Sequence, residues 1–188
     1  MTNKKYFIGN WKMFGDFNSF KIIKKINQFC LKSKKHKVVM CIPNTLIHFF
    51  NKKLKSKSIY LGAQNCHYNN SYGAYTGSVN AYMLKKAGAE YIILGHSENR
   101  QSGDTNYLIK KKIESSLKQK LNIIFCIGEN LSERRNKKTL NVLRKQIRSC
   151  LNKKFNLKKI FIAYEPVWSI GTNKILKINE LRKIIVFI

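Results

Sequence analysis

The chain has 188 residues, of which 44% are hydrophobic and 12% aromatic, and it carries a formal net charge of +28. This length and apolar content predict one folded domain, residues 1–188, and exclude a disordered chain. No apolar run approaches the roughly 20 residues of a membrane-spanning helix, and the apolar stretch near the start is too short for a signal peptide, so we expect a cytoplasmic protein without membrane contact.

Short apolar runs alternate along the chain with longer amphipathic stretches. The runs are continuously apolar, which is typical of parallel strands buried on both faces. The amphipathic stretches repeat apolar side chains every third or fourth residue, as helices that cover a sheet do. In chain order we predict strands at Tyr6–Gly9, Val38–Ile42, Ile59–Ala63, Tyr91–Leu94, Ile123–Cys126 and Ile160–Ala163, and helices at Phe17–Leu31, Thr105–Leu121 and Thr139–Leu151.

Glycine spacing indicates βα units of similar length. Gly62, Gly95 and Gly128 each close a predicted strand, and they follow one another at intervals of 33 residues. That interval fits a (β/α) barrel, although a doubly wound sheet has a similar period. No glycine-rich phosphate-binding motif follows any strand, which argues against a nucleotide-binding sheet.

The excess of basic residues, 37 Lys and Arg against 9 Asp and Glu, has two interpretations. Such a charge attracts polyanions, so RNA binding is one of them. The other is a general drift toward Lys at tolerant surface positions. Basic pairs are spread along the whole chain without a basic tail or an Arg-rich stripe, which favours drift and predicts no dedicated nucleic-acid site.

Cysteines and histidines show no metal-binding spacing. The five cysteines include no Cys-x-x-Cys motif and lie mostly in apolar runs, which indicates buried thiols without a disulfide framework. The four histidines include no His-x-x-x-His spacing. We therefore expect neither a metal ion nor another cofactor.

Three chemically capable residues follow predicted strands, where an α/β barrel has its active site. Lys12 lies beyond the first strand, His96 beyond the fourth and Glu165 beyond the sixth. Pro166 restricts Glu165 to an extended backbone, and a helix start at His96 favours the neutral imidazole. A base, a neutral imidazole and a cation suit proton abstraction next to a carbonyl through an enediolate.

Each of these residues also has a structural explanation. A lone Lys in so Lys-rich a chain is ordinarily a surface residue, His96 could cap a turn, and Glu165 could simply precede one. The segment that follows Glu165 predicts a stiff flap between hinges, in which Gly171 offers its N–H to a phosphate. The three positions together favour the catalytic interpretation.

Five motifs at the strand ends resemble the triosephosphate isomerase family, in the order and spacing of that family. They are Gly9-Asn10-Trp11-Lys12-Met13, Gly62-Ala63-Gln64-Asn65, Leu94-Gly95-His96-Ser97-Glu98, Cys126-Ile127-Gly128-Glu129 and Ala163-Tyr164-Glu165-Pro166-Val167-Trp168, with Ile170-Gly171-Thr172 after them. The resemblance implies a (β/α)8 TIM barrel with only its first six βα units present. It also implies an intramolecular aldose-ketose isomerase of glycolysis and gluconeogenesis, which interconverts dihydroxyacetone phosphate and glyceraldehyde 3-phosphate without a metal or cofactor.

The resemblance assigns roles to individual residues. Glu165, His96 and Lys12 would be catalytic, with Glu98 behind Lys12. The substrate-binding residues would be Asn10, Trp11, Lys12 and Gly171. Residues 65–79 would dock into a second copy of the chain and bring Thr76 near the neighbour's Asn10, which implies a homodimer.

The chain departs from the family pattern at four positions. Ser78 and Asn99 stand where the family usually has a Glu and an Arg that pair behind the interface loop, so both charges are absent together and neither is left buried alone. Asn173 replaces a flap Gly, and Asn tolerates a left-handed backbone. Ile178 replaces the Pro that commonly opens the next helix.

Eight βα units would need roughly 250 residues, whereas this sequence holds six. We expect open sheet edges at Tyr6–Gly9 and Ile160–Ala163 and barrel-interior side chains that face water. Residues 1–188 expressed alone should be aggregation-prone or molten, and essentially inactive. Two alternatives to an active isomerase stay open: an inactive remnant of the enzyme, and a basic RNA- or polyanion-binding protein built on part of a barrel.

Overall fold

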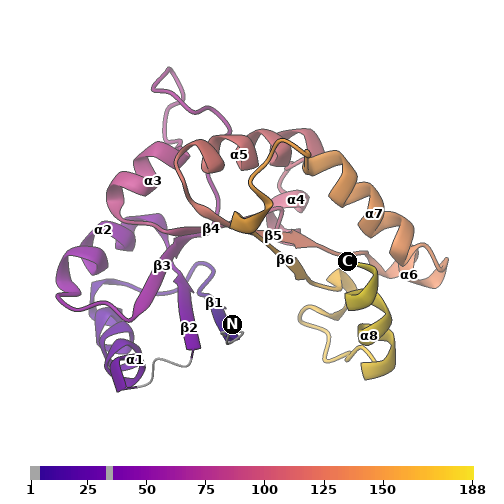
Figure 1. Ribbon diagram of the computed structural model, residues 1–188, viewed down its shortest axis with the longest axis horizontal. Coiled ribbons are helices and arrows are strands. Elements are labelled where there is room, and N and C mark those ends of the chain that lie inside the picture. Colours follow the sequence, from indigo (N-terminus) through magenta and orange to yellow (C-terminus); the bar gives the residue numbers. More distant parts are fainter. Residues whose placement is uncertain (1–4, 33–35) are drawn as a thin grey trace.

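The computed structural model describes residues 5–32 and 36–188. One sheet of six parallel strands forms its centre, and the order of the strands in space follows the chain (Figure 1). All six predicted strands are confirmed, with ends that shift by at most two residues. The strands are β1 Lys5–Asn10, β2 His36–Cys41, β3 Ile59–Ala63, β4 Tyr91–Leu94, β5 Asn122–Ile127 and β6 Ile160–Tyr164.

The helices cover the outer side of this curved sheet, whose edge strands are β1 and β6, and the molecule forms an arc that runs from α1 to α8 (Figure 1). The predicted fold, six βα units of a TIM barrel, is confirmed. The helices are α1 Phe20–Lys32, α2 Asn44–Lys53, α3 Ala81–Ala87, α4 Ser97–Gln101, α5 Asn106–Lys118, α6 Leu131–Arg135, α7 Thr139–Cys150 and α8 Ile178–Phe187, with 3-10 turns η1 Phe17–Ser19, η2 Leu157–Lys159 and η3 Val167–Ser169.

Polar caps set the helix boundaries. The Asn80 side chain accepts the Met83 N–H at the start of α3, and Thr105 does the same for Leu108 in α5. At α6, Asn130 and Glu133 form a reciprocal capping box, in which each side chain accepts the other's backbone N–H. These bonds satisfy donors that have no partner within the helix, and each stabilises its helix by about 1 kcal/mol.

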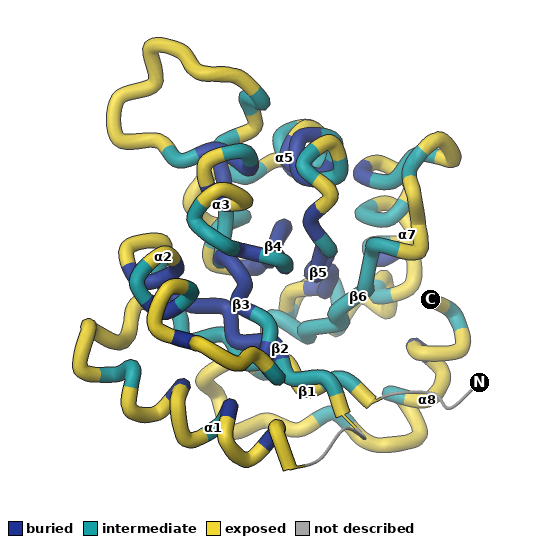
Figure 2. The backbone as a smooth tube through the Cα atoms, turned by 60° about the vertical axis from the view of Figure 1, so that its left-hand side comes forward, coloured by how far each residue is buried: buried dark blue, intermediate teal, exposed yellow. Residues whose placement is uncertain are grey.

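The larger hydrophobic core lies between the outer face of the sheet and the helices. Strand residues such as Ile92 and Phe125 pack there against helix residues such as Phe50 and Ile113, all of them fully buried. Complete burial of one such side chain contributes about 1.5–3 kcal/mol. Figure 2 shows the same distribution: the central strands are dark blue, and exposure increases toward α8.

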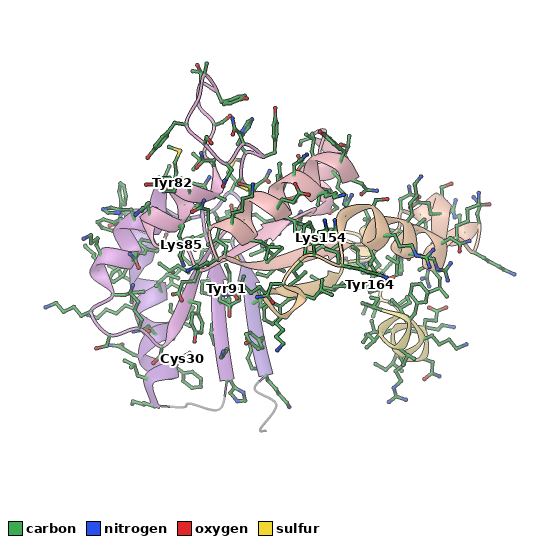
Figure 3. The ribbon with its side chains drawn as sticks, turned by 45° about the horizontal axis from the view of Figure 1, so that its top comes forward. Cys30, Tyr82, Lys85, Tyr91, Lys154 and Tyr164 are labelled. Atoms are coloured by element: carbon green, nitrogen blue, oxygen red, sulfur yellow. The ribbon has the colours of Figure 1, made fainter. Side chains whose placement is uncertain are left out.

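A second, smaller core lies on the inner, concave face of the sheet. It is made only of strand residues, because alternate side chains of a strand point to opposite faces. Its buried members are Val39, Cys41, Tyr91, Ile93, Ile124 and Cys126, of which Tyr91 is labelled in Figure 3.

The expectation that barrel-interior side chains face water is wrong for these inner-core residues, which are at most 4% exposed. The physical reason is contact across the arc. Tyr6 of β1 and Phe161 of β6 pack against the inner core and meet each other, with ring centroids 4.8 Å apart. The side chains of Tyr6 and Phe161 thus close the interior at this contact, although their strands do not pair with each other.

The outer faces at the two ends of the arc remain exposed. Phe7 on β1 is 55% exposed, and on α8 Ile185 is 60% and Val186 87% exposed. Within the described residues, β1 pairs only with β2 and β6 only with β5. The expectation of open edges at β1 and β6 is therefore confirmed.

The five cysteines are all free and buried, as the sequence predicted. Burial raises the pKa of the Cys41 thiol to about 12 and of the Cys66 thiol to about 11, so both are protonated at neutral pH. Within the described ranges, no helix combines the length and the apolar character that crossing a membrane requires.

Candidate active site

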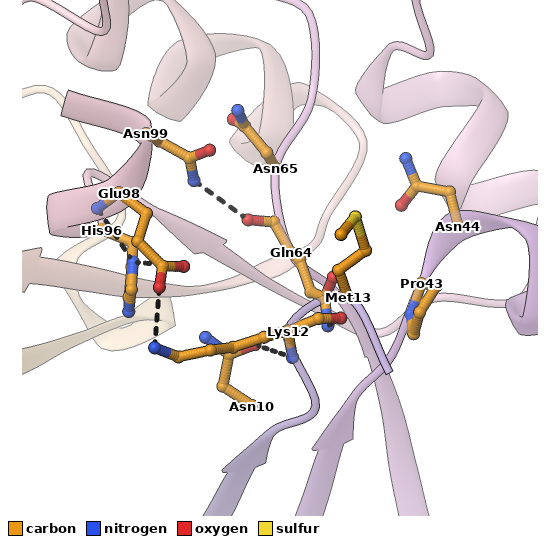
Figure 4. A pocket seen from close by; sticks show the side chains of 10 residues that line it. All are labelled: Asn10, Lys12, Met13, Pro43, Asn44, Gln64, Asn65, His96, Glu98 and Asn99. Atoms are coloured by element: carbon orange, nitrogen blue, oxygen red, sulfur yellow. Dashed lines mark hydrogen bonds and ion pairs between the residues drawn. The ribbon is translucent and has the colours of Figure 1, made fainter. Parts of the chain in front are cut away.

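A cleft of about 350 Å³ opens beyond the carboxyl ends of β1 to β4 (Figure 4). Polar side chains from four successive strand ends converge on it. Its lining residues are Asn10, Lys12 and Met13 after β1, Pro43 and Asn44 after β2, Gln64 and Asn65 after β3, and His96, Glu98 and Asn99 after β4.

Lys12 is held in the cleft by its backbone as well as its charge. Its φ of 53° lies in the left-handed region, which is unfavourable for a residue with a side chain. Hydrogen bonds on both sides fix this conformation: Asn10 Oδ1 accepts the Lys12 N–H at 3.0 Å, and Gln64 Nε2 donates to the Lys12 carbonyl at 2.8 Å. The backbone turn therefore aims the side chain into the cleft.

The Lys12 ammonium pairs with Glu98. Its Nζ lies 2.7 Å from Glu98 Oε1, and this hydrogen bond holds the pKa of Glu98 below its usual range. Both side chains are more than a third exposed, so the pair contributes little to stability. It holds a cation at the mouth of the cleft, ready for an anionic ligand.

His96 caps α4, and this fixes the direction of its ring. Its Nδ1 accepts the Glu98 N–H at 3.3 Å. A ring nitrogen that accepts a hydrogen bond carries no proton, so this geometry assigns the ring proton to Nε2. The Glu98 carboxylate also lies close to this ring, with its Oε2 3.6 Å from Nδ1.

Glu165 lies beside His96 at the end of β6. Its Oε2 is 3.2 Å from His96 Nε2, and its Oε1 accepts the Ser97 N–H at 2.7 Å. The Glu165 side chain is only 18% exposed. This burial raises the pKa of Glu165, although His96 and Ser97 oppose the shift, and such a shift brings a carboxylate closer to the range of a general base.

A glycine permits this position of Glu165. The β6 backbone approaches Gly128 so closely that a Cβ on Gly128 would lie 1.9 Å from the Glu165 carbonyl oxygen. The Glu165 N–H also donates to the Ile127 carbonyl at 2.9 Å, which continues the β5–β6 ladder. Gly128 thus allows Glu165 to sit next to the end of β5.

A buried carboxylate anchors the segment after Glu165. Glu129 is fully buried and accepts hydrogen bonds from Tyr164 Oη and from Trp168 Nε1, the latter at 2.9 Å. Its carbonyl accepts the Val167 N–H. Burial, with the carboxylate nearby, raises the pKa of Tyr164. Glu129 therefore fixes the first residues of the predicted flap.

The rest of the flap is exposed and uses two left-handed residues. Gly171 has a φ of 70° and Asn173 a φ of 57°, so Asn173 adopts the backbone that the sequence predicted it would tolerate. Thr172 Oγ1 donates to the Trp168 carbonyl at 2.9 Å. Gly171 is not among the residues that line the cleft.

The predicted site residues fall into two groups. Asn10, Lys12, His96 and Glu98 line the cleft, and Glu165 joins them through His96. The other three, Trp11, Gly171 and Thr76, do not line it. Trp11 packs in the outer core against Phe50, with ring centroids 6.2 Å apart, and Thr76 is exposed on the loop of residues 65–79.

Gln64 also follows the end of a strand, as Lys12 does, but no individual role for it was predicted from the sequence. A second contribution that the sequence did not predict comes from Lys112, whose Nζ lies 2.6 Å from Asp104 and 3.0 Å from Asn65 Oδ1. This nearly buried cluster anchors the start of the loop of residues 65–79. Among the described residues, no group of three or more His, Cys, Asp or Glu side chains is arranged to hold a metal ion.

Comparisons with known proteins agree on one family. The family model for triosephosphate isomerase matches residues 5–188. The triosephosphate isomerases of Alkaliphilus oremlandii and Dictyoglomus thermophilum are 38% and 40% identical, over 98% and 96% of this chain and 75% and 74% of their own length. The crystal structure of triosephosphate isomerase from Bartonella henselae aligns with a TM-score of 0.88 at 33% identity, over 98% of this chain and 73% of that one.

Proposed function

The chain belongs to the triosephosphate isomerase family, and from this premise we propose that Glu165, His96 and Lys12 carry out its reaction. The reaction interconverts dihydroxyacetone phosphate and glyceraldehyde 3-phosphate, a step of glycolysis. The family match favours this function over the two alternatives left open by the sequence, an inactive remnant and an RNA-binding protein.

In the proposed mechanism, Glu165 is the base. Its carboxylate leaves the Ser97 N–H, takes a proton from the carbon next to the substrate carbonyl, and returns that proton to the neighbouring carbon. The electron pair of the broken C–H bond forms the enediolate, and His96 would carry the hydroxyl proton of the first carbon to the oxygen of the second, so that carbonyl and hydroxyl exchange places. The 3.2 Å contact between Glu165 and His96 supports this role, because a substrate held by His96 would lie within reach of the carboxylate.

His96 and Lys12 would stabilise the charge that develops on the substrate oxygens. The proton on His96 Nε2 is available for hydrogen bonds to these oxygens, because Nδ1 is already occupied by the Glu98 N–H. The Lys12 ammonium, 2.7 Å from Glu98, supplies a positive charge at the mouth of the cleft. Preorganised donors of this kind contribute most where charge is formed in the transition state.

The flap would close over the bound substrate. Closure of a loop excludes water and completes the site, and triosephosphate isomerases are a standard example of it. Gly171 would then offer its N–H to the phosphate. Asn10 would contact the substrate directly, while Trp11 would support the site from the outer core.

We further propose that the chain acts as a cytoplasmic homodimer. The loop of residues 65–79 would insert into the partner subunit and bring Thr76 near the active site of the partner. The exposure of this loop and its anchoring at Asn65 by Lys112 support the proposal. Asn99 supports the same loop from the side of the active site, because its side-chain amide donates to the Gln64 carbonyl at 3.4 Å.

The contact between Glu165 and His96 carries the catalytic proposal, and isotope exchange tests it. We define the extended chain as residues 1–188 followed by the last two βα units of the Dictyoglomus thermophilum relative. In D₂O, the extended chain should convert dihydroxyacetone phosphate to product with deuterium incorporated from solvent. Glu165→Gln should lower kcat by about 10²–10⁴, whereas the control Glu114→Gln should not. Equal turnover in the two variants would contradict the assignment of Glu165.

A further inference from the structure

Arg134 of α6 contacts both ends of the flap. Its guanidinium carbon lies 4.2 Å from the ring centroid of Trp168, which belongs to the first turn of the flap. Its Nη2 lies 2.7 Å from Glu180 Oε2. Glu180 stands in the first turn of α8, directly after the flap. One side chain therefore bridges the two points between which the flap is suspended.

The surroundings of Arg134 favour a fixed position. Its Nη1 lies 3.7 Å from Oε1 of buried Glu129, the same oxygen that accepts the Trp168 indole N–H. The hydrogen bond from Arg134 also holds the pKa of Glu180 below its usual range. A guanidinium that is both stacked on an aromatic ring and paired with a carboxylate is more rigid than an ammonium would be.

We propose that Arg134 is a positioning residue that clamps the hinges of the flap. With its stack on Trp168 and its ion pair with Glu180, it fixes the spacing of the two ends, so that the exposed residues between them open and close as one body. Because Trp168 follows Glu165 by only three residues, the same clamp steadies the base. This inference rests on the flap closure described under the proposed function.

The neighbouring Arg135 provides a matched control. It lies on the same short helix and carries the same charge, but it is exposed. Among the described residues it makes no side-chain hydrogen bond or ion pair. Removing Arg135 therefore changes the net charge as removing Arg134 does, without touching the flap.

Trp168 reports directly on the clamp. The chain has two tryptophans, so Trp11→Phe leaves Trp168 as the single indole in residues 1–188. In this background we expect acrylamide to quench Trp168 more strongly in Arg134→Leu, and its fluorescence anisotropy to fall. Arg135→Leu should leave both unchanged. Arg134→Lys keeps the charge beside Glu129 but loses the planar stack, so its quenching should also rise.

Kinetics with the native Trp11 test the consequence for function. In the extended chain, Arg134→Leu should raise the KM for dihydroxyacetone phosphate roughly 3- to 30-fold, with a smaller loss in kcat and an unchanged pH profile for Glu165. Glu180→Gln should also raise KM, because it releases the flap, although only at its α8 end. Arg134→Lys and Glu180→Gln carry the test if Arg134→Leu does not fold.

The outcomes separate this inference from the proposed function. Quenching and KM that are the same in the Arg134, Glu180 and Arg135 variants would overturn the clamp, whatever the activity. Absence of isomerase activity in the unsubstituted extended chain would instead overturn the proposed function. The Trp168 signal of residues 1–188, measured at protein concentrations below the onset of association, would still decide whether Arg134 holds the flap.

Discussion

The rings of Tyr6 and Phe161 meet across the concave face of the sheet, with centroids 4.8 Å apart, although they belong to the first and the sixth strand. The contact is tilted, with an interplanar angle of 53°, as aromatic pairs commonly are. Behind it, Tyr91 packs as well, with its ring centroid 6.0 Å from that of Phe161. The two edge strands thus share one core without sharing a hydrogen bond.

This contact predicts a difference between two phenylalanines. Phe161→Ala should lower the free energy of unfolding by roughly 3 kcal/mol, because it removes a ring from the inner core. Phe7→Ala, at a side chain that is 55% exposed, should change it by less than about 1 kcal/mol. Urea unfolding at protein concentrations below the onset of association measures both. Equal effects at the two positions would mean that the inner core adds nothing to stability.

The sequence predicted the sheet and most of the cleft because both depend on local signals. A continuously apolar run marks a strand that is buried on both faces, and the residue after it lies at the active-site edge, which located Lys12, His96 and Glu165. The Tyr6–Phe161 contact could not be predicted in this way. It joins side chains that are 155 positions apart on strands that are not neighbours, and only the curvature of the sheet brings them together.

Arg134 shows a second limit of the sequence. It is one of 37 Lys and Arg residues, and neither its spacing nor its neighbours distinguish it from Arg135. Only the packing of α6 against Trp168 and Glu180 does so. In a chain this basic, the functional cations are identified by what they contact.

A prediction on the cation of the cleft compares Lys12 with Gln64. Lys12→Ala should lower kcat/KM of the extended chain by at least about 10²-fold, because it removes a charge aimed at the forming enediolate. Gln64→Leu should cost about 10-fold, because it removes the donor that fixes the Lys12 backbone but leaves the ammonium. Steady-state kinetics with dihydroxyacetone phosphate measures both.

The control for this pair is Lys24→Ala, at an exposed position of α1. It should leave kcat/KM unchanged. A Gln64→Leu variant as active as the unsubstituted chain would show that the left-handed turn at Lys12 does not depend on Gln64. A Lys12→Ala variant with full activity and full affinity would remove Lys12 from the mechanism.

A prediction on pH follows from the raised pKa of Glu165. Its ordinary value is 4.5, and burial raises it in the folded chain. A base works only when ionised, so kcat/KM should fall as the pH is lowered through this raised value, and the acid limb should lie above pH 4.5. A limb at or below that value would contradict the effect of burial.

The raised pKa of Glu165 also determines in which direction the free energy of unfolding changes with pH. Because the folded state binds the proton of Glu165 more tightly than the unfolded state does, stability falls as the pH rises from about 4.5 through the raised pKa. Glu165→Gln removes this loss, so its unfolding free energy should depend less on pH in that window. The opposite shift at Glu98 contributes little, because its side chain is 55% exposed. Urea unfolding across the window measures the two slopes.

The exposed apolar surfaces of β1 and α8 should drive association of the chain. Phe7 on β1 and Val186 on α8 expose apolar surface on the first strand and the last helix of the polypeptide, and two different exposed surfaces favour head-to-tail contacts that do not close. Residues 1–188 alone should therefore form oligomers whose mass grows with concentration, with little isomerase activity. Sedimentation velocity measures the mass.

Charge placed at the ends should reverse this association. Phe7→Lys combined with Val186→Lys should reduce the oligomers, whereas Tyr107→Lys, at a residue of α5 that is 66% exposed, should not. The extended chain should also lose them and gain turnover, because two further strands pair with the edges of β1 and β6. A discrete dimer that none of these changes affects would locate the association elsewhere, on the loop of residues 65–79.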